Sequence, residues 1–203
     1  MVIRAFRNIF NTICSLMVYI RNVLCVLMIF FILFKKHSRI KLPFTATSVR
    51  ALLNNIDSIG SNVYIGKNAR FGISRNATFK IGAGTWIGDD FEVSCNNSIE
   101  IGKNVLIGRR VFIGDTIHQY GNIDKPVITQ PMSENGYVKI EDDCWIGTGA
   151  CILPNVIIGK HSVIGANAVV TKDVPPYSVA VGIPAKVIKK YDFERNQWVK
   201  VKE

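Results

Sequence analysis

The sequence predicts an all-β chain folded as a parallel β-helix of six-residue repeats. The clearest support is the stretch 140–181, which reads IEDDCW, IGTGAC, ILPNVI, IGKHSV, IGANAV, VTKDVP and PYSVAV. Position one of each six is aliphatic through Val170 and is then Pro176, position five is small or slim, and Gly recurs at position two. A period of six fits neither a helix nor a lone strand, and it is typical of a hexapeptide β-helix.

The three recurring positions have distinct roles in the predicted coil, which consists of three short strands. We expect positions one and five to point into a triangular prism, where the aliphatic side chain fills the interior and the small residue clears its narrow parts. Gly at position two suits a backbone that must bend tightly, because glycine lacks a Cβ atom.

Upstream of this stretch the repeats are less regular. They begin near Ile59, loosen at 71–76 and again at 93–98, and resume at Ile101. Each break shifts the phase, which predicts small insertions at the corners of the first coils. Residues 119–139 have no sixfold pattern, and a loop of this length in a compact fold is usually functional.

The chain divides into three predicted parts. Residues 1–55 form an N-terminal hydrophobic, basic-flanked helical segment and a connector, 56–185 form the β-helix with its loop, and 186–203 form a basic tail. We expect the tail to be a short helix or strand that protects the exposed edge of the last coil. The connector, 40–57, shows little periodicity and leads into the first coil.

The hydrophobic stretch 9–34 has three possible interpretations. It exceeds the roughly 20 residues that span a bilayer, but Arg21 and Asn22 interrupt it. It could be a membrane-embedded or interfacial helix with basic flanks, a helix packed on the β-helix or at a subunit contact, or a single span. Because basic residues 35–41 adjoin the following domain, each interpretation keeps that domain in the cytoplasm. The expected location is the inner face of the cytoplasmic membrane.

Composition narrows the partners. The chain has 203 residues and a formal net charge of +10, with Lys and Arg concentrated at both ends. Basic ends favour an acidic membrane surface or a phosphorylated ligand, and no nucleic-acid-binding motif is present. The five cysteines form no CxxC pair, so we expect reduced thiols, no disulfide and no zinc site.

One of the three histidines is a candidate for chemistry. His37 lies in the basic linker, and His161 occupies an outward position of an ordinary repeat, so both are expected to be surface residues. His118 closes the last regular repeat and opens the long loop, with Asp115 three residues before it. This position at a boundary between coil and loop makes His118 the predicted functional residue.

Several motifs together resemble the hexapeptide-repeat O-acetyltransferases. They are WIG at 145–147, ILP at 152–154, VIGA at 163–166, VVTKDVPP at 169–176 and GIPAKVI at 182–188. The resemblance is dense over 140–189, moderate over 59–139 and absent from the first 55 residues. It is nearest to acetyltransferases of galactosides, maltose and nodulation sugars, of xenobiotics, and of capsule, colanic acid and O-antigen, and it implies a left-handed β-helix.

The resemblance implies a role for His118 as the general base that deprotonates an acceptor hydroxyl. Its oxygen then attacks the thioester of acetyl-CoA directly, without an acyl-enzyme. A histidine suits this role because its ordinary pKa of about 6.5 leaves it neutral yet basic in the cytoplasm. Asp115 is expected to orient the imidazole ring or to contact the sugar.

The remaining site residues follow from the same resemblance. Acetyl-CoA is expected to contact Trp145, Thr148, Ala166, Thr171, Lys172, Lys186 and Lys189. The expected acceptor contacts are Asn96, Asn97 and Tyr120. No metal is implied, and a carbonic anhydrase of this fold is excluded because it needs three histidine ligands.

The resemblance also implies a homotrimer, with His118 of one subunit facing Trp145 and Thr171 across a cleft that involves another. The hydrophobic front of the chain favours a membrane-linked glycan as acceptor, and residues 9–41 as the contact with the membrane. Two alternatives stay open at this point. One is an antibiotic-inactivating acetyltransferase, and the other is a non-catalytic scaffold, because a fold alone does not fix a function.

Overall fold

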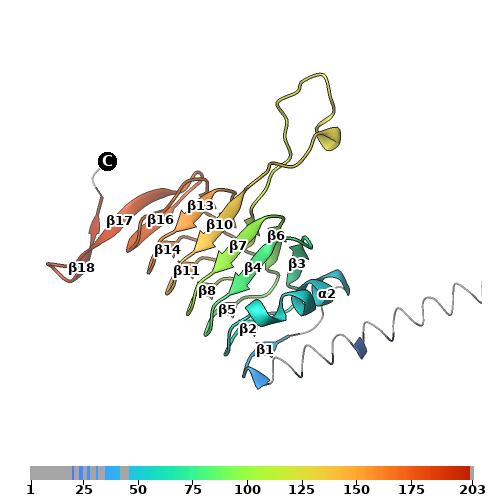
Figure 1. The fold of residues 1–203 in the computed structure, drawn as a ribbon. Helices are drawn as coiled ribbons and strands as arrows, with labels where there is room; N and C mark the ends of the chain where they lie inside the picture. Colours follow the sequence, from blue (N-terminus) through green and yellow to red (C-terminus); the bar gives the residue numbers. More distant parts are fainter. Residues whose placement is uncertain are drawn as a thin grey trace, which may run out of the picture.

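The computed structural model describes residues 20, 23, 24, 27, 31, 35–41 and 46–201. The described chain winds as a left-handed β-helix, whose strands fall into three sheets running along the molecule, as Figure 1 shows. Each coil passes from the first sheet to the third and then to the second. We call these sheets A, B and C, and the bends between them the A/C, C/B and B/A corners.

The strands of each sheet come from successive coils. Sheet A contains β1 (Arg39–Ile40), β2 (Tyr64–Ile65), β5 (Trp86–Ile87), β8 (Leu106–Ile107), β11 (Trp145–Ile146), β14 (Val163–Ile164), β16 (Ser178–Val181), β17 (Lys186–Asp192) and β18 (Gln197–Lys200). Sheet B contains β4 (Thr78–Ile81), β7 (Ser98–Ile101), β10 (Tyr137–Ile140) and β13 (Val156–Ile158). Sheet C contains β3 (Arg70–Ile73), β6 (Glu92–Cys95), β9 (Phe112–Gly114), β12 (Cys151–Ile152) and β15 (Val169–Val170).

Positions one and five of the repeat form the core, as the sixfold pattern predicts. Position one is buried from Ile140 through Val170, and position five is buried from Cys144 through Ala180. Pro176 is the exception, because it is exposed at the last B/A corner. The repeat therefore loses its phase at Pro176, although Ala180 is again buried.

The glycines at position two are required for a different reason from the one expected. They begin the corners but do not have the left-handed backbone, which in most repeats is at position four, as at Asn62, Asn104 and Asn167, where φ is 55–56°. A Cβ atom on Gly147 would lie 2.6 Å from the backbone nitrogen of Ala166 in the next coil. Position two therefore needs glycine because successive coils approach each other closely there.

The extra residues of the first coils lengthen strands as well as corners. In sheet C, β3 and β6 have four residues each, whereas β12 and β15 have two. The long loop leaves sheet C after β9 and returns at β10, which begins at Tyr137, so the loop ends earlier than residue 139. It projects from the C/B corner, as Figure 1 shows, and contains the short 3-10 helix η2 (Val127–Thr129).

The connector before the first coil is more regular than the sequence suggested. Strand β1 adds to sheet A beside β2, helix α2 (Ala46–Asn54) packs against β3, and the 3-10 helix η1 (Ile56–Ser58) follows. The short strand lacks a six-residue repeat of its own, which is why periodicity did not reveal it.

The hydrophobic segment 9–34 lies mostly outside the described residues. Ile20, Val23, Leu24, Leu27 and Phe31 are helical and exposed. Within the described part of the chain, no helix is both long and apolar enough to cross a membrane.

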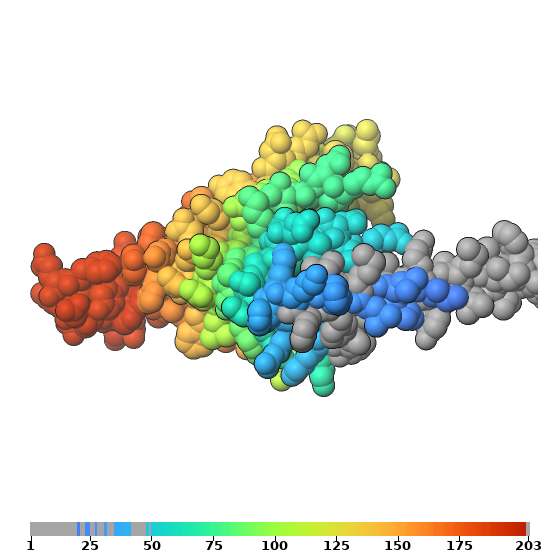
Figure 2. Space-filling model, turned by 60° about the horizontal axis from the view of Figure 1, so that its bottom comes forward, coloured from blue at the N-terminus to red at the C-terminus, as the bar shows by residue number. Residues whose placement is uncertain are grey.

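The C-terminal tail forms strands, one of the two structures that the sequence predicted for it. Strand β17 pairs antiparallel with β16, and β18 pairs antiparallel with β17, which extends sheet A past the last coil. Figure 2 shows this hairpin in red at the far end of the molecule from the blue N-terminal residues. It covers the open edge of β16, which would otherwise present unpaired backbone groups.

Candidate functional site

His118 lies at the neck of the long loop. The two ends of the loop run side by side there, because His118 forms a β-bridge with Met132 and the backbone nitrogen of Gln119 donates to the carbonyl of Pro131 at 2.8 Å. The His118 side chain is exposed. The fold thus holds the backbone of His118 on both sides while its imidazole remains accessible to a substrate.

Asp115 supports this neck from inside the protein. It is fully buried, and its carboxylate accepts hydrogen bonds from the backbone nitrogens of Asn96, Asn97 and Ser98 at 2.7–3.1 Å. The expected hydrogen bond to His118 is not among the contacts of the described residues. Because backbone amides occupy both carboxylate oxygens, Asp115 fixes the C/B corner on which the loop stands and does not face an acceptor.

The predicted acceptor residues gather at this same corner. Asn96 has both ends of its side chain engaged, since it donates to Thr116 Oγ1 at 2.8 Å and accepts from Ser74 Oγ at 2.7 Å. Asn96 therefore joins three coils, and its expected sugar contact stays a prediction. Tyr120, two residues beyond His118, is 70% exposed and is available to a ligand.

Trp145 lies on the outer face of sheet A, in a row of outward side chains that share one register. The row consists of Tyr64, Trp86, Leu106, Trp145, Val163, Val179, Lys189 and Lys200. Trp145 is 52% exposed. The row thus runs from the exposed indole of Trp145, past two valines, to Lys189 and Lys200 of the C-terminal hairpin.

Lys200 is a candidate that the sequence reasoning missed. It pairs with Lys189 across β17 and β18, so it lies at the end of the same outward row. Periodicity could not have identified it, because the two apolar residues of QWVK (197–200) are adjacent and do not alternate with polar ones.

Two further predicted donor residues lie beside this row at the A/C corner. Thr148 and Ala166 occupy position three of the repeat in neighbouring coils, and the backbone nitrogen of Asn167 donates to the carbonyl of Thr148 at 2.9 Å. Lys186 pairs with Val181 at the adjoining end of β16. Together with Trp145 and Lys189, these residues form one continuous surface, which we call the donor surface.

Thr171 and Lys172 lie elsewhere. They follow β15 at the C/B corner, on the same side of the prism as His118 and two coils further along. Within one chain, the predicted residues therefore divide between the C/B corner, with His118, and the donor surface. Sheet C separates the two groups.

The described cysteines do not form part of the site. Cys95, Cys144 and Cys151 are free thiols. Burial and, secondarily, the nearby carboxylate of Asp115 raise the pKa of Cys95 to about 12, and burial raises the pKa of Cys144 to about 11. Such thiols stay protonated and are poor nucleophiles. Among the described residues, no group of three His, Cys, Asp or Glu side chains could hold a metal ion.

Comparisons with known proteins fit this architecture. The family model "Bacterial transferase hexapeptide (six repeats)" matches residues 137–172. A galactoside O-acetyltransferase of Lactococcus lactis is 31% identical over 168 residues, which cover 78% of this chain and 75% of the relative. The "Putative lipopolysaccharide biosynthesis O-acetyl transferase WbbJ" of Escherichia coli is 36% identical over 122 residues, covering 56% of this chain and 61% of the relative.

A solved structure agrees as well. The hexapeptide-repeat acetyltransferase of Vibrio cholerae complexed with acetyl coenzyme A is 29% identical with a TM-score of 0.56, covering 63% of this chain and 67% of that one. The protein belongs to the hexapeptide-repeat acetyltransferase family. The chain spans only 56–61% of the length of several other curated relatives.

Proposed function

We propose that this protein transfers the acetyl group of acetyl-CoA to a hydroxyl of a sugar, with His118 as the general base. Membership of the family supports the reaction, and the Vibrio cholerae complex supports acetyl-CoA as the donor. The observation that carries the proposal is the exposed His118 at the loop neck, where its backbone bridges to Met132. An imidazole in this setting can approach an acceptor hydroxyl within hydrogen-bonding distance.

In the proposed reaction, the imidazole of His118 takes the proton of the acceptor hydroxyl as its oxygen attacks the thioester carbonyl. The carbon–sulfur bond then breaks, and the imidazolium returns the proton to the departing thiolate of CoA. In this proposal, Trp145 of the donor surface contacts the pantetheine arm, and Lys186, Lys189 and Lys200 contact the phosphates. Clustered cations suit a polyanionic ligand because the attraction accumulates over its phosphates.

The division of the site motivates a trimeric assembly. Sheet C separates His118 from the donor surface in one chain, whereas a second copy could bring its donor surface against the C/B corner. A heterologous contact that closes into a ring gives three identical sites.

We further propose that the acceptor is a precursor of a surface polysaccharide at the inner face of the cytoplasmic membrane. The names of the Lactococcus lactis and Escherichia coli relatives support a sugar acceptor, and the latter supports a lipid-linked one. The exposed apolar residues Leu24, Leu27 and Phe31, followed by Lys35 and Lys36, support attachment to an anionic bilayer.

The test is transfer of labelled acetyl from acetyl-CoA to lipid-linked glycans, with mapping of the acetylated carbon. We expect His118→Ala to lower kcat by about 10²–10⁴-fold while CoA still binds, because only proton transfer is removed. His161→Asn is the matched control, since His161 has left-handed backbone and Asn fills this repeat position elsewhere.

Three outcomes would contradict the proposal. Unchanged turnover by His118→Ala would remove the assigned base. Acetylation of antibiotics but not glycans would favour a xenobiotic acetyltransferase, and an absence of any transfer would favour a scaffold.

A further inference from the structure

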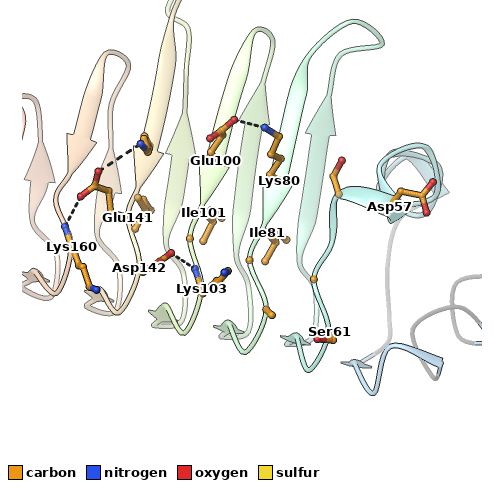
Figure 3. A pocket seen from close by; sticks show the side chains of 17 residues that line it. Asp57, Ser61, Lys80, Ile81, Glu100, Ile101, Lys103, Glu141, Asp142 and Lys160 are labelled. Atoms are coloured by element: carbon orange, nitrogen blue, oxygen red, sulfur yellow. Dashed lines mark hydrogen bonds and ion pairs between the residues drawn. The ribbon is translucent and has the colours of Figure 1, made fainter.

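Sheet B carries a groove that the proposed reaction does not use. Its volume is about 780 Å³, and it runs across coils from Asp57 to Lys160. Figure 3 shows its side chains lying across neighbouring strands, from Asp57 at one end to Lys160 at the other. This volume falls within the range of ordinary ligand sites, about 300–1,000 Å³.

The glycine column explains the shape of the groove. Gly60, Gly82 and Gly102 stack at the beginning of the B/A corner and expose backbone along the floor. Glu141 takes this position in the next coil, where it lies 3.6 Å from Lys139 Nζ and accepts from the backbone nitrogen of Lys160. Adjacent coils are about 4.8 Å apart, so the part of the groove from Gly60 to Glu141 is about 15 Å long, the length of a few linked sugar rings.

The walls of the groove favour a polar, uncharged ligand. They carry four lysines and four acidic residues, so the charges balance locally. Lys80 and Glu100 form an ion pair of 2.7 Å across two strands, with both side chains partly exposed (Figure 3). Ammonium groups donate hydrogen bonds and carboxylates accept them, which suits vicinal hydroxyls and gives a polyanion no net attraction.

The outer face of sheet B connects the groove with the proposed catalytic corner. Strand β10 begins directly after the loop and carries two outward residues, Tyr137 near the loop and Lys139 beside the groove. Tyr137 is 39% exposed and shares its row with Ser98 and Thr78. The outer face of sheet B thus joins the loop base to the groove through a Tyr ring and hydroxyl side chains, over about 13 Å of strand.

We propose that the outer face of sheet B binds the remote sugars of an extended, uncharged glycan while its reacting sugar lies at His118. This inference rests on the proposed function, because it concerns the acceptor of the same reaction. It assigns length selectivity to residues far from the reacting atoms: an oligosaccharide gains contacts in the groove that a single sugar cannot reach.

The test compares the full-length protein with two matched double variants. Lys80→Ala/Glu100→Ala removes the groove pair, and Arg70→Ala/Glu92→Ala removes an exposed cross-strand pair on sheet C. The probes are tetrasaccharides of glucose, galactose and N-acetylglucosamine, with the corresponding methyl glycosides as short acceptors. Calorimetry measures glycan binding without acetyl-CoA, and kinetics gives kcat/KM for each acceptor.

We expect the groove variant to lower both tetrasaccharide affinity and the ratio of tetrasaccharide to methyl-glycoside kcat/KM about tenfold, because charge-assisted hydrogen bonds are lost. The sheet C variant should retain both values. Ser61→Trp, which places a bulky side chain on the groove wall, should reproduce the loss. Binding equal to wild type in the groove variants, or no tetrasaccharide binding by wild type, would overturn the inference. Transfer to methyl glycosides reports separately on the proposed function.

Discussion

At the scale of single residues, positions two and four of the repeat have complementary tasks. Position four bends the chain with left-handed backbone, which is why Asn62, Asn104 and Asn167 recur there. Position two lets the next coil approach, so a side chain of any size interferes. Gly108 and Gly147 show this directly, because an added Cβ on either would lie 2.6 Å from a backbone nitrogen of the following coil.

We therefore predict that Gly147→Ala destabilises the protein by about 1–3 kcal/mol, the usual effect of overpacking. Gly72→Ala is the matched control, because its added Cβ meets only the Val93 carbonyl oxygen at 3.4 Å. Urea denaturation of both variants gives the free energies of unfolding. Equal stability of the two variants would mean that coil spacing is not the constraint on position two.

At the scale of elements, the first coil depends on the chain that precedes it. Ile40 of β1 belongs to the buried core. Lys36 Nζ donates to the carbonyls of Ile56 and Ile59 at 2.7 Å. The backbone nitrogen of Arg39 donates to the carbonyl of Val63 at 2.8 Å. A truncation that tests membrane attachment must therefore end before Lys36, or it also removes part of the β-helix.

We predict that deletion of residues 1–34 abolishes binding to vesicles containing phosphatidylglycerol and preserves thermal stability. Deletion of 1–41 should lower the melting temperature as well, because β1 and the Lys36 contacts are lost. Co-sedimentation and thermal melts separate the two effects. Vesicle binding that survives deletion of 1–34 would contradict the proposed attachment. As a control, this deletion should leave acetyl transfer to methyl glycosides unchanged.

The loop is the second element that tertiary contacts define. Its neck is held by bridges between its two ends, and within it the Gln130 amide nitrogen donates to the carbonyls of Asn122 and Lys125 at 2.9 and 3.0 Å. The loop therefore has internal structure of its own, although Ile123 and Ile128 are 94% and 85% exposed.

At the scale of the whole molecule, His118 lies apart from the donor surface within one chain. We can therefore test whether each active site is built from residues of two chains. In a mixed assembly of His118→Ala and Trp145→Ala chains, His118 of one variant can face Trp145 of the other. We predict that random co-assembly restores about one quarter of wild-type activity, because each residue of a two-chain site has an even chance of being intact.

The measurement is acetyl transfer after the two variants are unfolded together and refolded, with separately refolded and then mixed proteins as the control. Activity that stays at the level of the single variants would mean that each site is built within one chain.

The sequence alone predicted the β-helix, because a period of six specifies inward and outward positions for each residue. It also predicted the loop and singled out His118, since an interruption of a regular pattern is visible without coordinates. The burial of residues such as Ile146 and Ala150 was therefore predictable, because it follows from their positions within the six-residue repeat.

Only the tertiary structure decided which residues lie together. The stacking of coils assigned Asp115 and Asn96 to the support of a corner, joined Trp145 to Lys200, and built the groove from residues of five coils. The physical reason is that contacts between coils connect residues at variable separations in sequence, such as 22, 20 and 39 positions in successive coils. The six-residue period determines whether each side chain points inward or outward. The insertions between repeats determine which residues of the adjacent coils it contacts.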